Sequence, residues 1–187
     1  MKVEVVAYDP RWPLQFATVR DHLLAALDGV EVIAIEHVGS TSVPWLAAKP
    51  RLDIDVIVAA DAVGAASAGL VAAGYAPLGD LGIPDRYAFS APDDAPRRNV
   101  YVVVDGCLAL RNHLAVRDVL RRDQTLRNEY ARHKLELATR DYADNDDYVV
   151  DKSPVLQRIL EAAGIDPDER RAIDAMNRLD PHRLGNP

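Results

Sequence analysis

The pattern of hydrophobic and polar residues divides the chain into two parts: the first half is rich in predicted strands, and the second half is almost entirely helical. Apolar positions at helical spacing predict a helix over residues 13–27, and Gly29 follows it where a helix would end. Short β-branched runs predict strands at about 30–38, 52–58, 75–78 and 99–104, and an Ala-rich stretch predicts a helix over 61–73. Residues 79–97, with their glycines, prolines and aspartates, are predicted to form a loop with at most a brief strand at 87–89.

Helical periodicity dominates from about residue 108 onward. Helices are predicted at 112–121, 124–141, 146–163 and 167–178, the third with a break or kink at Pro154. No internal repeat and no Gly/Ser-rich linker divides the chain. The expected fold class is α/β (α+β), a mixed sheet with flanking helices in one domain over 1–178, with the core sheet at about 1–106, the helical part at about 107–178 and a tail at 179–187.

The composition supports a packed core, because 49% of the 187 residues are hydrophobic. The formal net charge of −7 argues against nucleic-acid binding over the whole surface, although Arg97, Arg98 and the arginines at 111–132 could form a local basic patch. Cys107 is the single cysteine, so no internal disulfide can form. No apolar stretch is long enough to span a membrane, and residues 1–10 lack the core of a secretory signal, so we expect a cytoplasmic protein.

The candidate chemistry lies between residues 37 and 56. A predicted strand ends in a Gly-Ser-Thr-Ser turn at 39–42, where glycine permits a close backbone approach and the hydroxyl and N–H groups suit a phosphate. The next strand carries Asp53 and Asp55, and i, i+2 spacing places both carboxylates on one face. Mg²⁺ (or Mn²⁺) is the simplest counter-charge for such a pair of hard oxygen ligands. The alternative is a solvated strand face with salt bridges to Lys49 and Arg51.

Two motifs at a fixed distance resemble a known signature. Gly39-Ser40 is followed by twelve residues and then Asp53-x-Asp55, which is similar to the nucleotidyltransferase superfamily with the polymerase-β-like fold. When longer segments around these motifs are included, the sequence resembles the GrpB (UPF0157) family over roughly residues 4–163. The segments that carry this resemblance are His37-Val38-Gly39-Ser40-Thr41-Ser42-Val43-Pro44, Ala47-Ala48-Lys49-Pro50, Asp53-Ile54-Asp55-Val56, Asn99-Val100-Tyr101-Val102, Arg117-Asp118-Val119-Leu120-Arg121, Tyr130-Ala131-Arg132-His133-Lys134 and Tyr148-Val149-Val150-Asp151-Lys152.

The resemblance implies an enzyme that transfers a nucleotidyl group from a nucleoside triphosphate, such as ATP, to an unknown small-molecule acceptor with the help of Mg²⁺. Asp53 and Asp55 are then the catalytic residues and metal ligands. The expected nucleotide- and phosphate-binding residues are Gly39, Ser40, Ser42, Lys49, Arg117, Lys134 and Lys152. The expected acceptor pocket consists of His37, Trp45 and Tyr101.

This chain departs from the family pattern at two of these positions. Trp45 stands where the family usually has glycine, and Tyr101 stands where it commonly has histidine and where the wider superfamily often places a third carboxylate. The lack of that carboxylate favours a second hypothesis, a non-catalytic nucleotide-binding module or a partner or folding-helper module similar to the C-terminal extension of some dephospho-coenzyme A kinases. Activation of a substrate carboxylate or amine by ATP is a third. The sequence leaves the acceptor, the base and the oligomeric state open.

Overall fold

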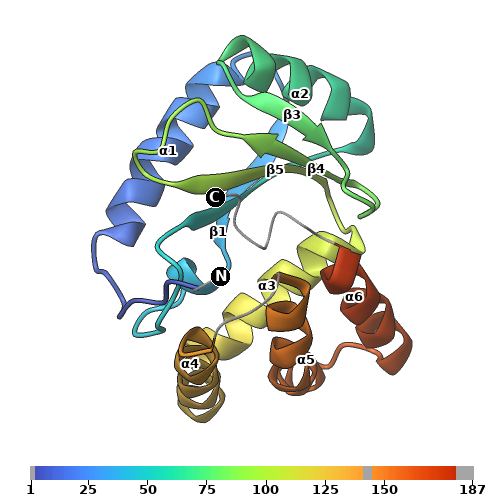
Figure 1. Cartoon of the computed structure of the whole chain (residues 1–187). Helices are drawn as coiled ribbons and strands as arrows, with labels where there is room; N and C mark the ends of the chain where they lie inside the picture. Colours follow the sequence, from blue (N-terminus) through green and yellow to red (C-terminus); the bar gives the residue numbers. More distant parts are fainter. Residues whose placement is uncertain (1–2, 141–144, 180–187) are drawn as a thin grey trace.

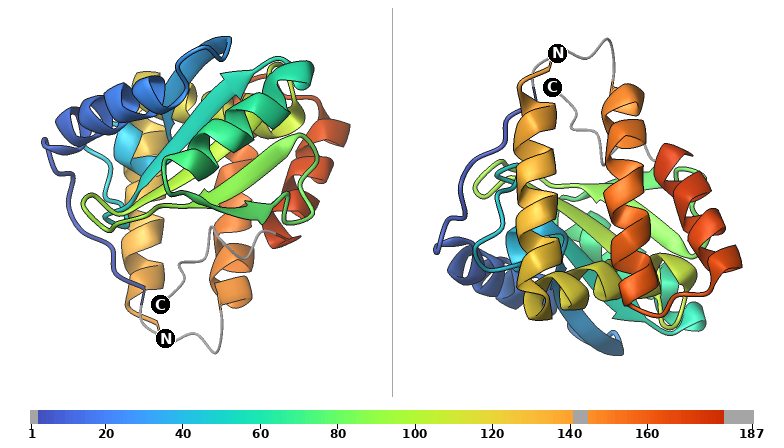
Figure 2. Two further views of the ribbon diagram at one scale, coloured as in Figure 1. Left: turned by 90° about the horizontal axis from the view of Figure 1, so that it is seen from above. Right: turned by 90° about the horizontal axis from the view of Figure 1, so that it is seen from below.

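The computed structural model describes residues 3–140 and 145–179, and within the helices it omits the side chains of residues 145–153 and 177–179. The chain forms three layers, with two helices on one face of a five-stranded sheet and four on the other (Figures 1 and 2). A mixed sheet with flanking helices was predicted, and this architecture confirms it. None of the described helices is long and apolar enough to cross a membrane.

The sheet has the strand order β1-β2-β5-β4-β3, in which only β2 and β5 run parallel. The strands are β1 (Val32–Val38), β2 (Leu52–Val58), β3 (Ala76–Gly79), β4 (Arg86–Ser90) and β5 (Arg98–Val104). The brief strand allowed at 87–89 within the predicted loop over 79–97 is longer in the structure, because β4 pairs with β5 along its length and with β3 over Ala88–Ser90. Three of the five residues of β4 are buried, but the polar residues on either side of this short segment gave little indication of a strand. Near the N-terminus, Val6 forms an isolated antiparallel β-bridge with Ala48.

Two helices, α1 (Trp12–Ala26) and α2 (Val63–Ala72), cover the first face of the sheet. The short turns η1 (Ser40–Ser42) and η2 (Ala60–Ala62) follow β1 and β2. The main hydrophobic core lies here, where alternate residues of β2 such as Ile54 and Val56 pack against Leu23 of α1 and Leu70 of α2. The intervening β2 residues, including Asp53 and Asp55, must therefore face the opposite layer.

The opposite layer consists of α3 (Leu108–Arg122), α4 (Gln124–Ala138), α5 (Asn145–Ala162) and α6 (Pro167–Leu179). Of the break or kink predicted at Pro154, a break does not occur, because α5 continues through that residue; the kink stays a prediction. The segment after the Gly-Ser turn at 39–42 anchors this layer, because Val43 and Leu46 are fully buried against Leu120, Tyr130 and Ile159. Packing of this segment fixes the turn at 39–42 between the sheet and the helices.

Candidate active site

The turn after β1 holds its glycine in a conformation that is essentially restricted to glycine. Gly39 has φ +67° and ψ −171°. A Cβ at this position would lie 2.2 Å from Oδ2 of Asp53. The turn is closed by Ser42, whose Oγ donates a hydrogen bond to the carbonyl of Gly39 at 2.7 Å. The absence of a side chain at Gly39 therefore lets the turn backbone lie directly against the Asp53 carboxylate.

The two aspartates share one face of β2 but differ in their surroundings. Asp53 is half-buried, and its Oδ1 accepts a hydrogen bond from Nδ2 of Asn99 at 2.8 Å across the β2–β5 pair. Asp55 is fully buried, and its Oδ2 accepts a hydrogen bond from Nδ1 of His113 at 2.7 Å. Its Oδ1 has no hydrogen-bond partner among the described residues. One oxygen of a fully buried carboxylate thus lacks a hydrogen-bond partner in this part of the chain.

His113 is a site residue that the sequence reasoning missed. It lies on the face of α3 that also carries Leu110, Arg117 and Arg121, at spacings of three or four residues. The helix was expected to begin at residue 112, whereas it begins at Leu108, which moves His113 into the second turn. The sequence did contain a signal for this residue, because His113 precedes Arg117 and Arg121 at spacings of four and so shares their helix face.

Two lysines lie around Asp53 and the turn. Lys134 is buried, and its Nζ donates to Oγ of Ser40 at 2.7 Å and to the carbonyl of Ala47 at 2.8 Å. Burial lowers the pKa of Lys134 to about 7, while the charge of Asp53 acts in the opposite direction. Burial and the neighbouring Arg51 also lower the pKa of Lys49, again against the influence of Asp53. The tertiary structure therefore brings Ser40 and both lysines into the neighbourhood of the same carboxylate.

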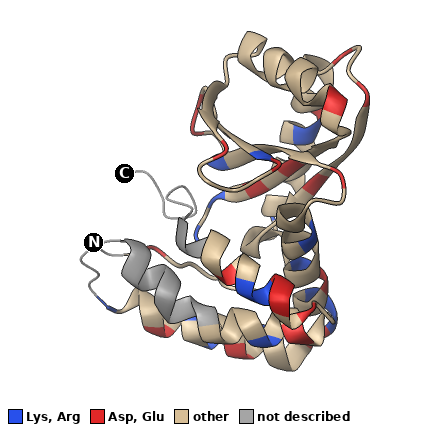
Figure 3. Ribbon diagram, turned by 90° about the vertical axis from the view of Figure 1, so that its right-hand side faces the viewer, with Lys and Arg blue, Asp and Glu red and all other residues tan. Residues whose placement is uncertain are grey.

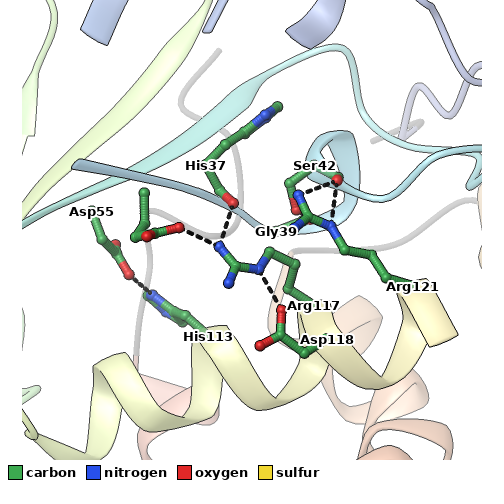
Figure 4. Close-up of polar contacts among 9 residues, drawn as sticks. His37, Gly39, Ser42, Asp55, His113, Arg117, Asp118 and Arg121 are labelled. Carbon is green, nitrogen blue, oxygen red and sulfur yellow. Dashed lines mark hydrogen bonds and ion pairs between the residues drawn. The ribbon is translucent and has the colours of Figure 1, made fainter. Parts of the chain in front are cut away.

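The arginines of α3 hold the backbone of the turn from the helical side (Figure 4). Arg117 pairs with Glu36 and Asp118, and its Nη1 donates to the carbonyl of His37 at 3.3 Å. Arg121 donates from Nε and Nη2 to the carbonyl of Ser42 at 3.1 and 2.9 Å. The donors of Arg117 are thus engaged with carboxylates and backbone, and its expected contact with a phosphate stays a prediction.

The three residues expected in an acceptor pocket do not come together. The His37 side chain points away from the aspartates (Figure 4), because it pairs with Ile54 in the β1–β2 register and stacks on Phe16 of α1. Trp45 is 76% exposed, with a φ of +70°, and contacts the ring of Tyr8. Tyr101 faces the aspartate side but is only 2% exposed, with the Arg86 guanidinium over its ring. Strand alternation and burial therefore keep His37, Trp45 and Tyr101 apart.

His37 makes the stability of the fold sensitive to acid. Burial and the charges of Arg121 and Arg117 lower its pKa from 6.5 to about 4. Because the unfolded state binds this proton more readily, the stability that neutral His37 contributes is present above pH 6.5 and is lost as the pH falls toward 4. The contribution is about 3 kcal/mol from the pKa difference. Urea unfolding from pH 7 to pH 4 should show a smaller loss of stability in His37→Gln than in the unmodified protein, and equal losses would contradict this role.

The remaining candidate, Lys152, lies in α5, but its side chain is outside the described residues. Within the described part of the chain, no group of three or more His, Cys, Asp or Glu side chains is arranged to hold a metal ion. A cation on Asp53 and Asp55 would take its other ligands from water or from phosphate oxygens, as Mg²⁺ commonly does.

The family profile described as GrpB protein matches residues 2–162 of this chain. The chain belongs to the GrpB family. This GrpB protein is also similar to the UPF0157 protein YqkA of Bacillus subtilis, with 33% identity over 87% of the chain. The match covers 47% of YqkA, so this chain spans about half the length of that relative.

Two further relatives match along nearly their whole length. A UPF0157 protein of Streptomyces coelicolor is 36% identical over 88% of this chain and 86% of its own. The crystal structure of the conserved protein GrpB from Enterococcus faecalis superposes with a TM-score of 0.75 at 30% identity, covering 86% of this chain and 96% of that one. The family membership predicted from the sequence is confirmed.

Proposed function

We propose that this GrpB protein binds a nucleoside triphosphate together with Mg²⁺ and transfers the nucleotidyl group to a small-molecule acceptor. The observation that carries this proposal is the contact between the Gly39 backbone and Oδ2 of Asp53, where no Cβ could be accommodated. It sets a turn of glycine and hydroxyl residues beside a pair of strand carboxylates. A phosphate chain and its counter-ion require these two groups side by side.

The donor set suits a hard divalent cation. Asp53 and Asp55 offer carboxylate oxygens from one strand face, and Oδ1 of Asp55 is buried without a hydrogen-bond partner among the described residues. A buried carboxylate oxygen in that condition is costly unless a cation or donor reaches it. Mg²⁺ bound there would neutralise phosphate charge and stabilise the charge that develops at the reacting phosphorus.

The protein's own residues would bind and orient the triphosphate. Ser40 is partly exposed, and its hydroxyl oxygen accepts a hydrogen bond from Nζ of the buried Lys134. Lys49 adds positive charge on the same side, near Asp53. Arg117 and Arg121 fix the turn through backbone carbonyls, so the hydroxyl is presented from a rigid segment.

A second candidate, nucleotide binding without turnover, is favoured by two observations. Asp55 is fully buried and already paired with His113. Tyr101 on β5, opposite Asp55 in the register, supplies no third carboxylate. Release of pyrophosphate distinguishes the candidates, because transfer of a nucleotidyl group liberates it and binding alone does not.

Nucleic acid is a less supported acceptor. In Figure 3, acidic and basic positions are interspersed along the helical layer rather than separated onto different faces. Arg111 pairs with Glu169 and Arg158 with Glu129, so arginines of this layer already have acidic partners. A small acceptor fits this surface better than a polyanion does.

Asp53→Asn should weaken binding of Mg²⁺-nucleotide by at least about tenfold, because a neutral amide is a poorer ligand for the cation. An asparagine oxygen can still accept the hydrogen bond from Asn99, so the fold should persist. Isothermal titration calorimetry with Mg²⁺ and each of ATP, GTP, CTP and UTP measures the change. Asp61→Asn, at an exposed carboxyl in η2, is the matched control and should bind like the unmodified protein. Undiminished affinity of Asp53→Asn would remove the proposed site.

A further inference from the structure

A row of hydrogen-bonded side chains leads from Asp53 to the side opposite the turn at 39–42. Oδ2 of Asp53 lies so close to Gly39 that a Cβ there would approach it to 2.2 Å, whereas Oδ1 accepts the hydrogen bond from Nδ2 of Asn99 at 2.8 Å. Oδ1 of Asn99 in turn accepts a hydrogen bond from Nη1 of Arg51 at 3.3 Å. Arg51 stands two residues before Asp53, as expected for side chains on one face of a strand. The turn and Arg51 are therefore connected to different oxygens of one carboxylate.

The backbone of Arg51 is fixed by two hydrogen bonds. Its carbonyl accepts from Oγ1 of Thr41 at 3.3 Å, and its N–H donates to the carbonyl of Lys49 at 2.7 Å, which closes a three-residue turn around Pro50. Burial and then the charge of Arg51 lower the pKa of Lys49, so this short turn holds two cations close enough to repel each other. An anion bound beside them would relieve that repulsion.

The guanidinium of Arg51 has fewer partners than those of two other half-buried arginines. Arg98 donates from Nη1 and Nη2 to both carboxylate oxygens of Asp93, at 2.8 and 2.9 Å, and Arg117 pairs with two carboxylates. Within the described part of the chain, Arg51 makes one side-chain hydrogen bond, to Asn99, and no salt bridge. A guanidinium has five N–H donors in a planar fork that matches a carboxylate or a phosphate. Arg51 therefore keeps donors for an anion.

We propose that Arg51 and Asn99 form the subsite for the acceptor, and that the acceptor carries an oxyanion group, a carboxylate or a phosphate; this inference deepens the proposed function and rests on it. The fork of Arg51 binds two oxygens of the anion, and the second N–H of the Asn99 amide donates to it. With the triphosphate at the turn and the anion at Asn99, Asp53 and its cation lie between the two substrates.

This placement suits a single displacement at the α-phosphorus, because anchoring the acceptor by its anion orients its nucleophilic group. An oxygen or nitrogen of the acceptor forms a bond to the α-phosphorus, and the bond from the α-phosphorus to the bridging oxygen breaks. Pyrophosphate leaves with that electron pair, and the proton of the acceptor passes to water.

The test uses the full chain saturated with Mg²⁺ and an α,β-methylene analogue of a nucleoside triphosphate, which occupies the turn at 39–42. Inorganic phosphate and acetate are titrated separately, and NMR follows the arginine Nε–H and asparagine side-chain amide signals. The Nε–H signal of Arg51, assigned by its loss in Arg51→Lys, should shift to saturation, and the Asn99 amide signals should shift with it. Tighter binding of phosphate or of acetate shows which oxyanion the acceptor carries.

Two substitutions of Arg51 separate charge from geometry. Arg51→Gln should weaken binding of the better probe by at least about tenfold. Arg51→Lys keeps the charge but loses the planar fork, and should weaken it by about threefold or more. The affinity of both variants for the triphosphate analogue should change by less than about threefold at physiological salt, because Arg51 lies on the other side of Asp53 from the turn. Arg20→Gln, at an arginine of α1 on the other face of the sheet, is the matched control and should bind both ligands like the unmodified protein.

Calorimetry with Mg²⁺-nucleotide, performed first, separates this inference from the proposed function. Absence of nucleotide binding by the unmodified protein would overturn the proposed function and the acceptor subsite with it. Nucleotide binding without binding of either probe, or probe binding that Arg51→Gln leaves unchanged, would overturn the subsite and leave the proposed function standing. Equal losses of nucleotide and probe affinity in Arg51→Gln would assign Arg51 to the triphosphate and also overturn the subsite. The unfolding midpoint of each variant is measured, and Arg51→Lys decides the test if Arg51→Gln does not fold.

Discussion

Gly39→Ala is expected to abolish binding of Mg²⁺-nucleotide and to destabilise the protein by at least about 2 kcal/mol. The new Cβ would lie 2.2 Å from Oδ2 of Asp53, and the backbone conformation at φ +67° and ψ −171° disfavours any side chain. Either Asp53 or the turn must then move, and each movement separates the hydroxyl of Ser40 from the carboxylate. Urea unfolding measures the stability, and calorimetry measures the binding.

Gly29→Ala is the matched control for this prediction. Gly29 also has a positive φ, +79°, but a Cβ there has nothing within 4 Å. We expect a cost of about 1 kcal/mol from backbone strain alone and unchanged nucleotide affinity. If Gly39→Ala bound nucleotide as well as Gly29→Ala does, the close contact between the turn and Asp53 would have no role in binding.

His113→Leu is expected to reduce the free energy of unfolding by about 3–5 kcal/mol, because it leaves the buried Asp55 carboxylate without its partner. The hydrogen bond from Nδ1 to Oδ2 spans 2.7 Å, and both side chains are almost fully buried. The second oxygen of Asp55 has no hydrogen-bond partner among the described residues that could compensate. The change in urea unfolding midpoint measures the loss.

A double variant separates the pair from the packing around it. Asp55→Val combined with His113→Leu removes both polar groups, and Ile57, Tyr101 and Leu110 supply an apolar environment nearby. The double variant should recover most of the stability that His113→Leu loses, while nucleotide binding stays absent because Asp55 is gone. Additive destabilisation in the cycle would show that the pair is not energetically coupled.

The strands and helices with a strong periodic signal were predictable from the sequence. The β2 run places apolar residues on both sides of each aspartate, and the alternation correctly predicted one shared face for Asp53 and Asp55. β4 was underestimated because Asp85 and Pro92 flank a short apolar run, and pairing with β5 on one side and β3 on the other stabilises it. Such long-range pairing leaves little trace in local composition.

The candidate site was only partly predictable for the same reason. The Gly-Ser turn and the Asp-x-Asp strand are near each other in sequence, so their spacing carried information about their contact. His113 is 58 residues from Asp55 and Lys134 is 94 residues from Ser40, and their encounters depend on how the helices pack. His37 and Trp45 are close to the turn along the chain, yet one faces α1 and the other is exposed.

The sequence by itself determined the family and most of the elements, and it predicted the motif pair of the candidate site, because each of these is carried by local patterns and short spacings. Only the tertiary structure decided the electrostatic state of that site. Asp55 is buried against His113, and Lys134, which lies among the buried apolar residues of α4, contacts the Ser40 hydroxyl. The physical reason is that burial and long-range contacts set the cost of a charge, and these depend on which surfaces meet when the helical layer closes over the sheet.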